Sequence, residues 1–229
     1  MILFLDYDGT LVPIVNSPQE AIIDKNKKKI LISLSQKHKI VIITGRDIKS
    51  FRKVFGKIPN SIFVISSHGS KIFRNETLVK IISYYSMPDV TYLKKKIKNM
   101  KGVILEEKEG CIALHYRNYT GDEYLLKRIF EEFTKLYPPQ KVIEGKKVIE
   151  AFYIDSDKGK AVESFLRFVA WEGKDPILYI GDDKTDLYAI KKVKQLGGRT
   201  FFVGDKKPPE ADCLFRSVEE VYRFLLSFK

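Results

Sequence analysis

Residues 2–10 read ILFLDYDGT, and this stretch decides the fold. Four consecutive apolar residues are typical of a strand that is buried on both faces of a parallel sheet. The run ends at Asp6, and a second carboxylate, Asp8, follows before Gly9 and Thr10. In an open α/β sheet, ligands bind beyond the carboxyl ends of the strands. The stretch therefore predicts a buried strand that ends in a pair of acidic functional residues.

Four further apolar runs have the same character, because they are rich in Ile, Val and Phe and are continuous rather than alternating. These runs are Ile40–Ile43, Ile62–Ile65, Ile177–Ile180 and Phe201–Val203. Segments with helical spacing of apolar residues separate them and predict helices over 48–55, 161–169, 187–196 and 217–225. Strands that alternate with helices predict a doubly wound α/β core with a mostly parallel sheet.

Residues 87–154 follow a different pattern. A Lys-rich helical segment, a hairpin, a second helical segment and a second hairpin follow one another, with turns at glycine residues. This order predicts a small antiparallel sheet with two helices on one face. We therefore expect an α+β domain over 87–154, inserted into an α/β core domain that comprises 1–86 and 155–229.

Composition narrows the class of protein. The 229 residues are 44% hydrophobic and 31% charged, which fits a globular chain with a sizeable core. No apolar run exceeds about five residues, against about 20 for a membrane span. Cys111 and Cys213 lie in apolar stretches, where free cysteines are expected. We expect a cytoplasmic monomer with no leader segment and no membrane contact.

The charge balance is strongly basic. The 41 Lys and Arg residues against 29 Asp and Glu residues give a net charge of +12, which is compatible with a nucleic-acid ligand. The lysines, however, form short runs spread over helix-like segments, with few aromatic residues between them. This distribution favours solvated helix faces, so we expect no nucleic-acid partner. A positive field would still speed the encounter with a small anionic substrate.

Several predicted strands deliver carboxylates to the same edge of the sheet. They are Asp6, Asp8, Asp182, Asp183 and, farther along the last motif, Asp186. Such a group cannot ionise in a small space unless a cation offsets the repulsion. An all-oxygen, acid-rich set without His or Cys selects a hard ion, most naturally Mg²⁺. The alternative, that each Asp merely caps the helix after it, explains single residues better than the whole set.

The neighbouring groups suit a phosphate. Mg²⁺ held by few carboxylates keeps positions for a substrate phosphate. Thr44 offers a hydroxyl, the turn at Gly45 offers backbone amides, and Lys158 offers a cation at the start of a helix. A carboxylate is a competent nucleophile toward phosphorus. With Asp6 and Asp8 two residues apart, one would attack while the other handles protons.

Four segments resemble, in order, the four motifs of phosphatases of the haloacid dehalogenase superfamily. These segments are residues 6–11, 43–46, 157–159 and 181–186. The resemblance implies that Asp6 forms an aspartyl phosphate, that Asp8 protonates the leaving oxygen and then activates water, and that Thr44 and Lys158 hold the phosphoryl oxygens. It also implies that Mg²⁺ is bound by Asp6, by the main-chain carbonyl of Asp8 and by Asp182. Asp183 and Asp186 would lie nearby as direct or outer supports.

Further segments resemble trehalose-6-phosphate phosphatases, in which the inserted domain is a type IIB-like cap. They are His68-Gly69 and residues 102–108, 115–117 and 145–150. Strand periodicity places Glu106 and Lys108 on one face of one strand, His115 and Arg117 on one face of the next, and Glu150 on a third. The resemblance implies that the sugar contacts Arg46, His68, Gly69, Glu106, Lys108, His115, Arg117 and Glu150.

Three departures from the family pattern bear on the substrate. Ser67 stands where the family usually has Glu, Leu187 replaces a common acid, and residues 151–153 lack the usual Arg and Pro. We expect a Mg²⁺-dependent phosphatase of trehalose 6-phosphate in trehalose biosynthesis. The alternatives are a phosphatase of another phosphorylated sugar or glycoside, a phosphorylatable signalling module of receiver type, and a basic nucleic-acid-binding protein. A receiver needs about half this length, and nucleic-acid binding leaves the acidic cluster unexplained.

Overall fold

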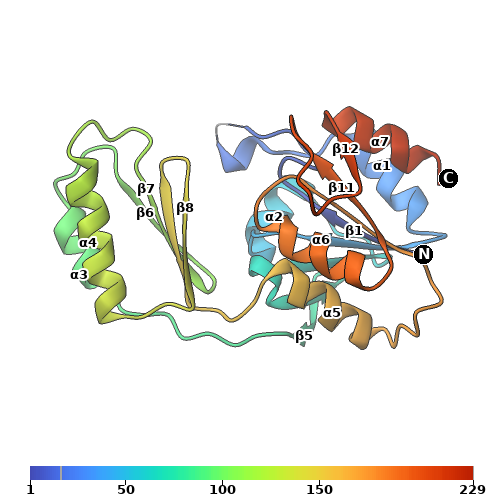
Figure 1. Ribbon diagram of the computed structural model, residues 1–229, viewed down its shortest axis with the longest axis horizontal. Coiled ribbons are helices and arrows are strands. Elements are labelled where there is room, and N and C mark those ends of the chain that lie inside the picture. The colour runs from blue at the N-terminus through green and yellow to red at the C-terminus, as the bar shows by residue number, and fades with distance from the viewer. Residues whose placement is uncertain (16, 229) are drawn as a thin grey trace. The chain divides into compact units, whose positions relative to one another are not determined.

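The computed structural model describes residues 1–15 and 17–228, and the chain falls into two compact units. The core unit comprises Met1–Ile82 and Ser156–Lys229, and the inserted unit comprises Ser83–Asp155. Figure 1 shows the two units joined by two connecting segments. The chain thus leaves the core unit once and returns to it once.

The core unit is built on an eight-stranded sheet in the order β12-β11-β10-β1-β2-β3-β4-β5. All neighbouring pairs are parallel up to β3, and β4 and β5 add an antiparallel edge. The strands are β1 (Ile2–Asp6), β2 (Lys39–Ile43), β3 (Ile62–Ser66), β4 (Lys71–Arg74), β5 (Thr77–Ile81), β10 (Ile177–Gly181), β11 (Arg199–Val203) and β12 (Cys213–Phe215). The predicted doubly wound, mostly parallel α/β core is confirmed.

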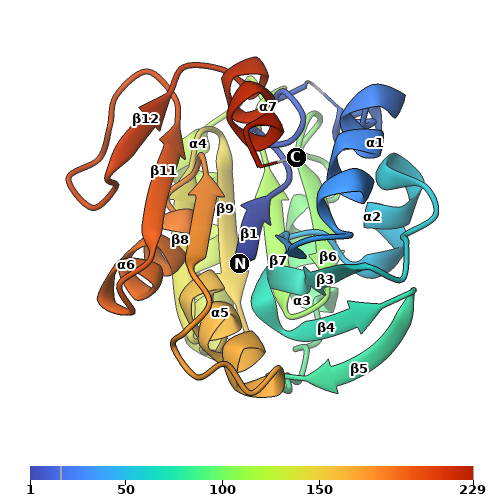
Figure 2. The same ribbon diagram turned by 90° about the vertical axis from the view of Figure 1, so that its right-hand side faces the viewer.

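Helices cover both faces of this sheet (Figure 2). One face packs against α1 (Lys25–Leu34), α2 (Ile48–Phe55) and α7 (Val218–Leu226), and the other against α5 (Lys158–Phe168) and α6 (Asp186–Gln195). Two short 3₁₀ turns, η1 (Pro18–Glu20) and η2 (Ser67–Gly69), complete the unit. Leu3 and Leu5 point to the first face and Phe4 to the second, as the alternation of a strand requires.

The helix boundaries follow from their caps. The side chain of Asp47 accepts a hydrogen bond from the amide of Ser50, and α2 begins at Ile48, directly after Asp47. Ser217 accepts a hydrogen bond from the amide of Glu220 in the same way at α7. Helix α6 ends just before Gly197, whose φ of +77° is the left-handed conformation that commonly ends helices. The predicted helices over 48–55, 187–196 and 217–225 are thus confirmed to within one residue at each end.

Strands β4, β5 and β12 were not among the predicted strands. The turn between β4 and β5 consists of Asn75 and Glu76, which both adopt positive φ, +49° and +62°. A two-residue hairpin of this kind usually carries glycine, so its sequence signal is missing here. Strand β12 is three residues long, too short for a periodic pattern.

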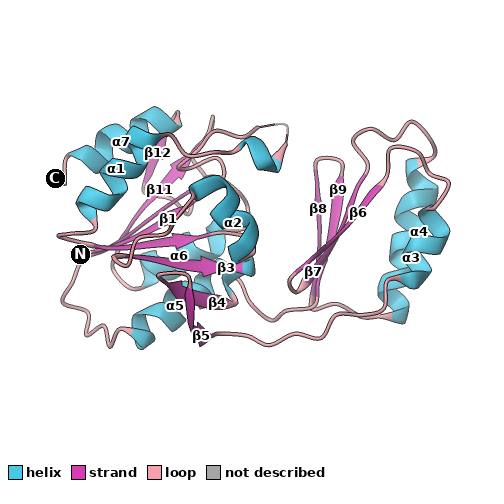
Figure 3. Cartoon of the chain, turned by 180° about the vertical axis from the view of Figure 1, so that it is seen from behind, coloured by secondary structure: helices cyan, strands magenta, loops and turns pink. Residues whose placement is uncertain are grey.

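The inserted unit is a four-stranded antiparallel sheet in the order β6-β7-β9-β8, with two helices on one face (Figure 3). Its elements are α3 (Thr91–Ile97), β6 (Ile104–Lys108), β7 (Cys111–His115), α4 (Glu123–Leu136), β8 (Lys141–Gly145) and β9 (Val148–Phe152). Leu114 and Ile149 on the sheet pack with Leu126 and Phe133 on α4. The predicted order of helix, hairpin, helix, hairpin is confirmed.

One detail of this unit was predicted wrongly. Strand β7 ends at His115, so Arg117 does not continue its polar face and lies exposed in the following turn. The amide of Tyr119 donates to the carbonyl of Tyr116 and closes this turn, while the Tyr116 side chain is buried. Tyr116 packs in the same apolar cluster as Ile112 and Leu114, and Arg117 lies in the turn that follows because the strand has already ended.

Two chemical expectations concern the whole chain. Cys111 and Cys213 are free thiols, and Cys111 is fully buried. Burial raises the pKa of the Cys111 thiol to about 12. Among the described residues, no helix combines the length and apolar composition that crossing a lipid bilayer requires.

Candidate active site

The acidic residues lie where the central strands of the core unit end. Strand β1 pairs with β2 on one side and with β10 on the other, and Asp6 is level with Ile43. Thr44 follows β2 directly, and Asp182 follows β10. Parallel register therefore brings side chains from distant parts of the sequence to one edge of the sheet, as predicted.

Three carboxylates meet at this edge. Asp6, Asp182 and Asp186 each place a carboxylate oxygen within 4.8 Å of the others. Burial raises the pKa of Asp6 to about 7, against the opposing effect of Lys158. Burial, with the charges of Asp6 and Asp186, raises the pKa of Asp182 to about 9. The site is therefore short of positive charge.

Lys158 is the cation that the structure does supply. Its Nζ donates to Asp6 Oδ1 at 2.7 Å and to Asp186 Oδ1 at 2.6 Å, and the side chain is only 6% exposed. Burial alone would lower the pKa of Lys158, but the two carboxylates outweigh it and raise the pKa. An ammonium group has three protons, so one remains for a third acceptor.

The start of α5 is built to deliver this lysine. Asp157 caps the helix by accepting from the amides of Gly159 and Lys160. A Cβ at Gly159 would lie 2.7 Å from the carbonyl oxygen of Tyr188 on α6, so glycine allows the two helices to approach closely. The close approach sets Lys158 between a residue of β1 and a residue of α6.

Asp186 has its acceptor positions filled. Oδ1 accepts from Lys158 and from the Tyr179 hydroxyl, and Oδ2 accepts from the amides of Asp182 and Asp183 at 3.1 and 2.9 Å. Its side chain is completely buried. A carboxylate offers about four acceptor positions, so Asp186 is occupied by the protein itself.

Asp6 differs from Asp186 in this respect. Its Oδ2 is buried and has no hydrogen-bond partner among the described residues. A buried, orphaned carboxylate oxygen is costly unless a ligand occupies it. Asp182 lies beside it and accepts a long hydrogen bond, 3.4 Å, from the hydroxyl of Thr10. The two residues form an all-oxygen donor set of the kind that fits a hard divalent cation.

Asp183 stands apart from this group. Its side chain is exposed, and its Oδ1 accepts from the adjoining amide of Lys184. The cluster of three described acidic residues contains Asp186 in its place. The backbone amide of Asp183, rather than its carboxylate, contacts the cluster.

Asp8 faces a different partner. Arg46 donates from Nε to Oδ2 at 2.7 Å and from Nη2 to Oδ1 at 2.6 Å, a bidentate ion pair. The Asp8 side chain is 36% exposed, whereas that of Asp6 is 6% exposed. Arg46, predicted as a sugar contact, thus lies against the proposed proton-transfer residue.

The loop after β2 contains the other predicted phosphate ligands. Thr44 is buried, and its hydroxyl accepts from the amide of Arg46 at 3.1 Å. Within the described residues, no acceptor is found for the proton of that hydroxyl. The ring of His68 lies so close to Gly45 that a Cβ there would be 2.8 Å from its Cε1. His68 therefore joins the loop at the site.

Gly69 has a packing reason to be glycine. Its φ is +96°, and a Cβ would lie 2.8 Å from the carbonyl oxygen of Asp157. Ser156 also donates from Oγ to the Gly69 carbonyl at 2.9 Å. The residue thus ties η2 to the start of α5, and this role accounts for it without a sugar contact.

The inserted unit carries a separate polar cluster on the sheet face opposite its helices. Register places Glu106 level with Ala113, which is level with Glu150. Lys108 Nζ donates to Glu150 Oε1 at 2.9 Å, and Glu106 Oε2 contacts His115 Nε2 at 2.9 Å. The hydrogen bond with His115 lowers the pKa of Glu106. Four of the five predicted residues of this face are together, and Arg117 is not among them.

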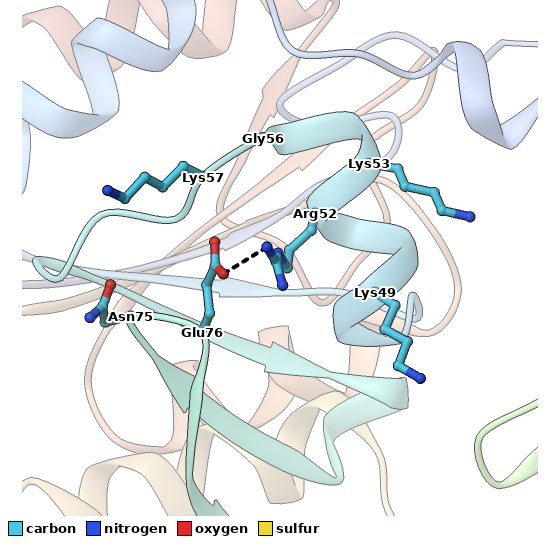
Figure 4. A pocket seen from close by; sticks show the side chains of 7 residues that line it. All are labelled: Lys49, Arg52, Lys53, Gly56, Lys57, Asn75 and Glu76. Carbon is cyan, nitrogen blue, oxygen red and sulfur yellow. Dashed lines mark ion pairs between the residues drawn. The ribbon is translucent and has the colours of Figure 1, made fainter.

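A pocket of about 580 Å³ lies elsewhere in the core unit, between the end of α2 and the β4–β5 turn. Arg52 pairs with Glu76 at 3.0 Å inside it, and the charged ends of Lys49, Lys53 and Lys57 point in different directions (Figure 4). The β4–β5 turn follows the end of β4, and the end of β4 lies beside the start of β3, where Arg74 pairs with Phe63. The pocket is thus toward the opposite edge of the sheet from the carboxylates and does not form part of the site.

Tyr179 is the residue that the sequence reasoning missed. It lies on β10, is buried, and donates from its hydroxyl to Asp186 Oδ1. The only available signal was a hydroxyl-bearing side chain inside an apolar strand, two residues before the acidic motif. Strand alternation points Tyr179 and Gly181 the same way, toward the helix that carries Asp186.

Comparison with known families gives one model that matches residues 4–204, described as trehalose-phosphatase. Trehalose-phosphate phosphatase B of Arabidopsis thaliana is 29% identical over 98% of this chain, which spans 65% of that relative's length. Probable trehalose-phosphate phosphatase 2 of Oryza sativa is 30% identical over 97% of this chain and 66% of its own length. The chain therefore spans about two thirds of the length of these relatives.

Two solved structures share the fold. A trehalose-6-phosphate phosphatase related protein has a TM-score of 0.77 and 24% identity, covering 99% of this chain and 96% of its own. The C-terminal domain of the Candida albicans trehalose-6-phosphate phosphatase has a TM-score of 0.77 and 23% identity, covering 99% and 91%. At these identities the likeness establishes the fold.

Proposed function

The chain belongs to the trehalose-phosphatase family, and from this premise we propose that it is a phosphoric monoester hydrolase that converts trehalose 6-phosphate to trehalose and phosphate. The observation that carries the proposal is the arrangement at the end of β1. Asp6 is buried beside Lys158 with one oxygen unpartnered, while Asp8 is partly exposed and held by Arg46. Two neighbouring carboxylates thus have the different environments that a nucleophile and a proton-transfer group require.

In the first step, an electron pair of the Asp6 carboxylate forms a bond to phosphorus. The bond between phosphorus and the sugar oxygen breaks, and Asp8 in its acid form gives a proton to that oxygen, so that trehalose leaves. Lys158 and Thr44 would donate to the phosphoryl oxygens with the ammonium proton and the hydroxyl proton for which the described residues provide no acceptor. Positioned donors of this kind supply most of the catalysis in phosphoryl transfer.

In the second step, Asp8 accepts a proton from water, and the water oxygen attacks the phosphorus of the aspartyl phosphate. The bond between phosphorus and Asp6 breaks, which releases inorganic phosphate and restores the free carboxylate. Each turnover therefore consumes one water molecule and returns both aspartates to their starting forms.

A divalent cation completes the proposal. Asp6, Asp182 and the main-chain carbonyl of Asp8 would hold Mg²⁺, which would offset the charge of the phosphate when bound. The buried, unpartnered Asp6 oxygen and the raised pKa values of Asp6 and Asp182 support this assignment. Asp186 would act through its contacts and not as a ligand, because its oxygens are already occupied. Asp183 would have an outer role.

Sugar recognition would belong to the inserted unit, which we propose to act as a cap domain. The face formed by Glu106, Lys108, His115 and Glu150 presents carboxylates and nitrogen donors suited to sugar hydroxyls. Burial alone would lower the pKa of Lys108, but Glu150 and Glu106 outweigh it and raise the pKa, so the residue remains a charged donor. The exposed Arg117 would contribute from its turn.

The test is a hydrolysis screen across sugar phosphates together with p-nitrophenyl phosphate. We expect trehalose 6-phosphate to be the preferred substrate. Glu106→Ala, Lys108→Ala and Glu150→Ala should each lower its kcat/KM roughly tenfold to a hundredfold, since losing one buried hydrogen bond costs about 1–3 kcal/mol. The small aromatic ester lacks the sugar and should be affected far less.

Three results would change the proposal. Equal losses on both substrates would assign the cluster to folding or closure. Preference for another sugar phosphate would favour the second candidate, a phosphatase of a different phosphorylated sugar or glycoside. The replacement of the usual Glu by Ser67, which precedes His68 at the site, is the observation that keeps this candidate open. Absence of hydrolysis of every ester would reject both.

A further inference from the structure

We infer that Tyr179 is a positioning residue, whose hydroxyl fixes the Asp186 carboxylate so that Asp186 and Asp6 hold the Lys158 ammonium between them. The inference rests on the proposed phosphatase reaction and adds to it a residue that does not touch the substrate. It concerns Tyr179 on β10 and Asp186 on α6, which are both buried.

Hydrogen bonds between buried atoms connect Tyr179 to Asp186, Asp186 to Lys158, and Lys158 to Asp6. The Tyr179 hydroxyl lies 2.5 Å from Asp186 Oδ1, and Lys158 Nζ lies 2.6 Å from the same oxygen. Lys158 Nζ is then 2.7 Å from Asp6 Oδ1. Tyr179, Lys158 and Asp186 are all at most 5% exposed, so water does not compete for these hydrogen bonds.

The hydroxyl limits how strongly Asp186 holds the lysine. Two donors share Oδ1, and the two backbone amides fix Oδ2, so the carboxylate neither rotates nor gives both lone pairs of Oδ1 to Lys158. Without the hydroxyl, Oδ1 would interact with Lys158 alone and draw the ammonium away from Asp6. A displacement of about 1 Å at a reacting group costs about a hundredfold in rate.

The backbone at Gly181 also allows the contact between Tyr179 and Asp186. Gly181 is on the same side of β10 as Tyr179, and a Cβ there would lie 2.5 Å from Asp186 Cβ. Glycine at this position therefore lets the start of α6 lie directly against the strand. That approach brings the Asp186 carboxylate within reach of the tyrosine hydroxyl.

The experiment compares Tyr179→Phe with the wild type, with p-nitrophenyl phosphate as substrate and Mg²⁺ present. The ring and its packing remain, so we expect a kcat at least about tenfold lower, a smaller change in KM, and an inorganic phosphate dissociation constant about tenfold higher by calorimetry. Tyr222→Phe is the matched control, because it also loses one buried hydroxyl bond, to the Leu11 carbonyl at 3.2 Å, and should leave all three values unchanged.

A double-mutant cycle separates positioning from stability. In a Lys158→Met background, Tyr179→Phe should produce no further loss of phosphate affinity, because the residue acts through the lysine. The same loss in both backgrounds, or wild-type kinetics in Tyr179→Phe, would overturn the inference. A wild type that hydrolyses no ester would instead reject the proposed function, and the phosphate titrations would still decide the role of Tyr179.

Discussion

Arg46 grips both carboxylate oxygens of Asp8, at 2.7 and 2.6 Å, whereas Lys158 contacts a single oxygen of Asp6. A planar guanidinium fixes the plane of the carboxylate that it pairs with, and an ammonium does not. Asp8 is therefore held in one orientation beside Asp6, which suits a group that transfers protons in the proposed reaction.

Replacing Arg46 by Lys keeps the positive charge and removes the bidentate pair of hydrogen bonds to Asp8. We expect turnover of trehalose 6-phosphate to fall at least about tenfold, because Asp8 would lose its fixed orientation and with it part of the roughly 10²- to 10⁴-fold that general acid–base catalysis contributes. p-Nitrophenyl phosphate has a good leaving group that does not need protonation, so its phosphorylation step should be much less affected. Pre-steady-state rates for both substrates measure the difference. Equal losses would give Arg46 a phosphate-binding role instead.

Substitution of the two aspartates should produce different defects. Asp6→Asn and Asp8→Asn should each lower kcat roughly 10²- to 10⁴-fold. With p-nitrophenyl phosphate, Asp8→Asn should still release one equivalent of p-nitrophenol in a burst, since only the second step lacks its base. Asp6→Asn should show no burst. A burst in Asp6→Asn would contradict its role as nucleophile.

Gly9 should be sensitive to a single methyl group. It has a φ of +89°, and a Cβ would lie 2.0 Å from Asp182 Oδ2, so Gly9→Ala must displace that carboxylate. Gly197→Ala is the control, because its φ is +77° and nothing lies within 4 Å of its Cβ. Both should lose about 1–2 kcal/mol of stability through the left-handed backbone. Only Gly9→Ala should also lose Mg²⁺ affinity and activity.

Metal binding should become more stabilising as pH rises. The pKa values of Asp6 and Asp182 are raised from 3.8 to about 7 and about 9, so the metal-free folded protein holds protons that the unfolded chain has released. Its stability should therefore fall as pH increases from about 4 toward 9. Mg²⁺ replaces those protons, and its effect should grow over the same range.

Thermal unfolding with and without millimolar Mg²⁺ checks this expectation. The increase in Tm should be larger at about pH 8.5 than at about pH 5.5, by at least roughly 2–4 °C. Asp182→Asn removes one of the two raised carboxylates and should abolish most of the difference. A Mg²⁺ effect that is independent of pH would contradict the assignment of the metal to these residues.

The sequence predicted the strand-end residues well, because burial on both faces leaves an unambiguous apolar run and parallel order determines where each run ends. Asp6, Thr44 and Asp182 are brought together for that reason. Helix boundaries at Asp47 and Ser217 were equally local, since a cap depends on neighbouring amides. Residues whose position depends only on their neighbours in sequence and on strand register could thus be predicted from the sequence.

Contacts between side chains from different helices and strands could not be predicted in this way. Nothing near Arg46 in the sequence indicates that it pairs with Asp8, and the pairing of Tyr179 with Asp186 depends on how closely α6 approaches β10. Arg117 was misplaced because β7 ends at His115 and a turn follows, and the spacing of residue types does not indicate where the strand ends. The role of each polar group depended on packing distances that periodicity does not contain.

The split of the core unit between two ends of the chain affects the order of folding. Strand β1 is enclosed by β2 and β10, and Ile2 pairs with Ile177, so one side of β1 stays unpaired until the late strand is available. The inserted unit is continuous in sequence. Local contacts form faster than distant ones. During refolding, pulse-labelling hydrogen exchange should therefore show protected amides in β7 and β9 before those in β1 and β10. Protection of β1 at the same rate as β7 would contradict this order. If β1 and β10 are protected last, the acidic edge of the sheet is among the last features of the molecule to form.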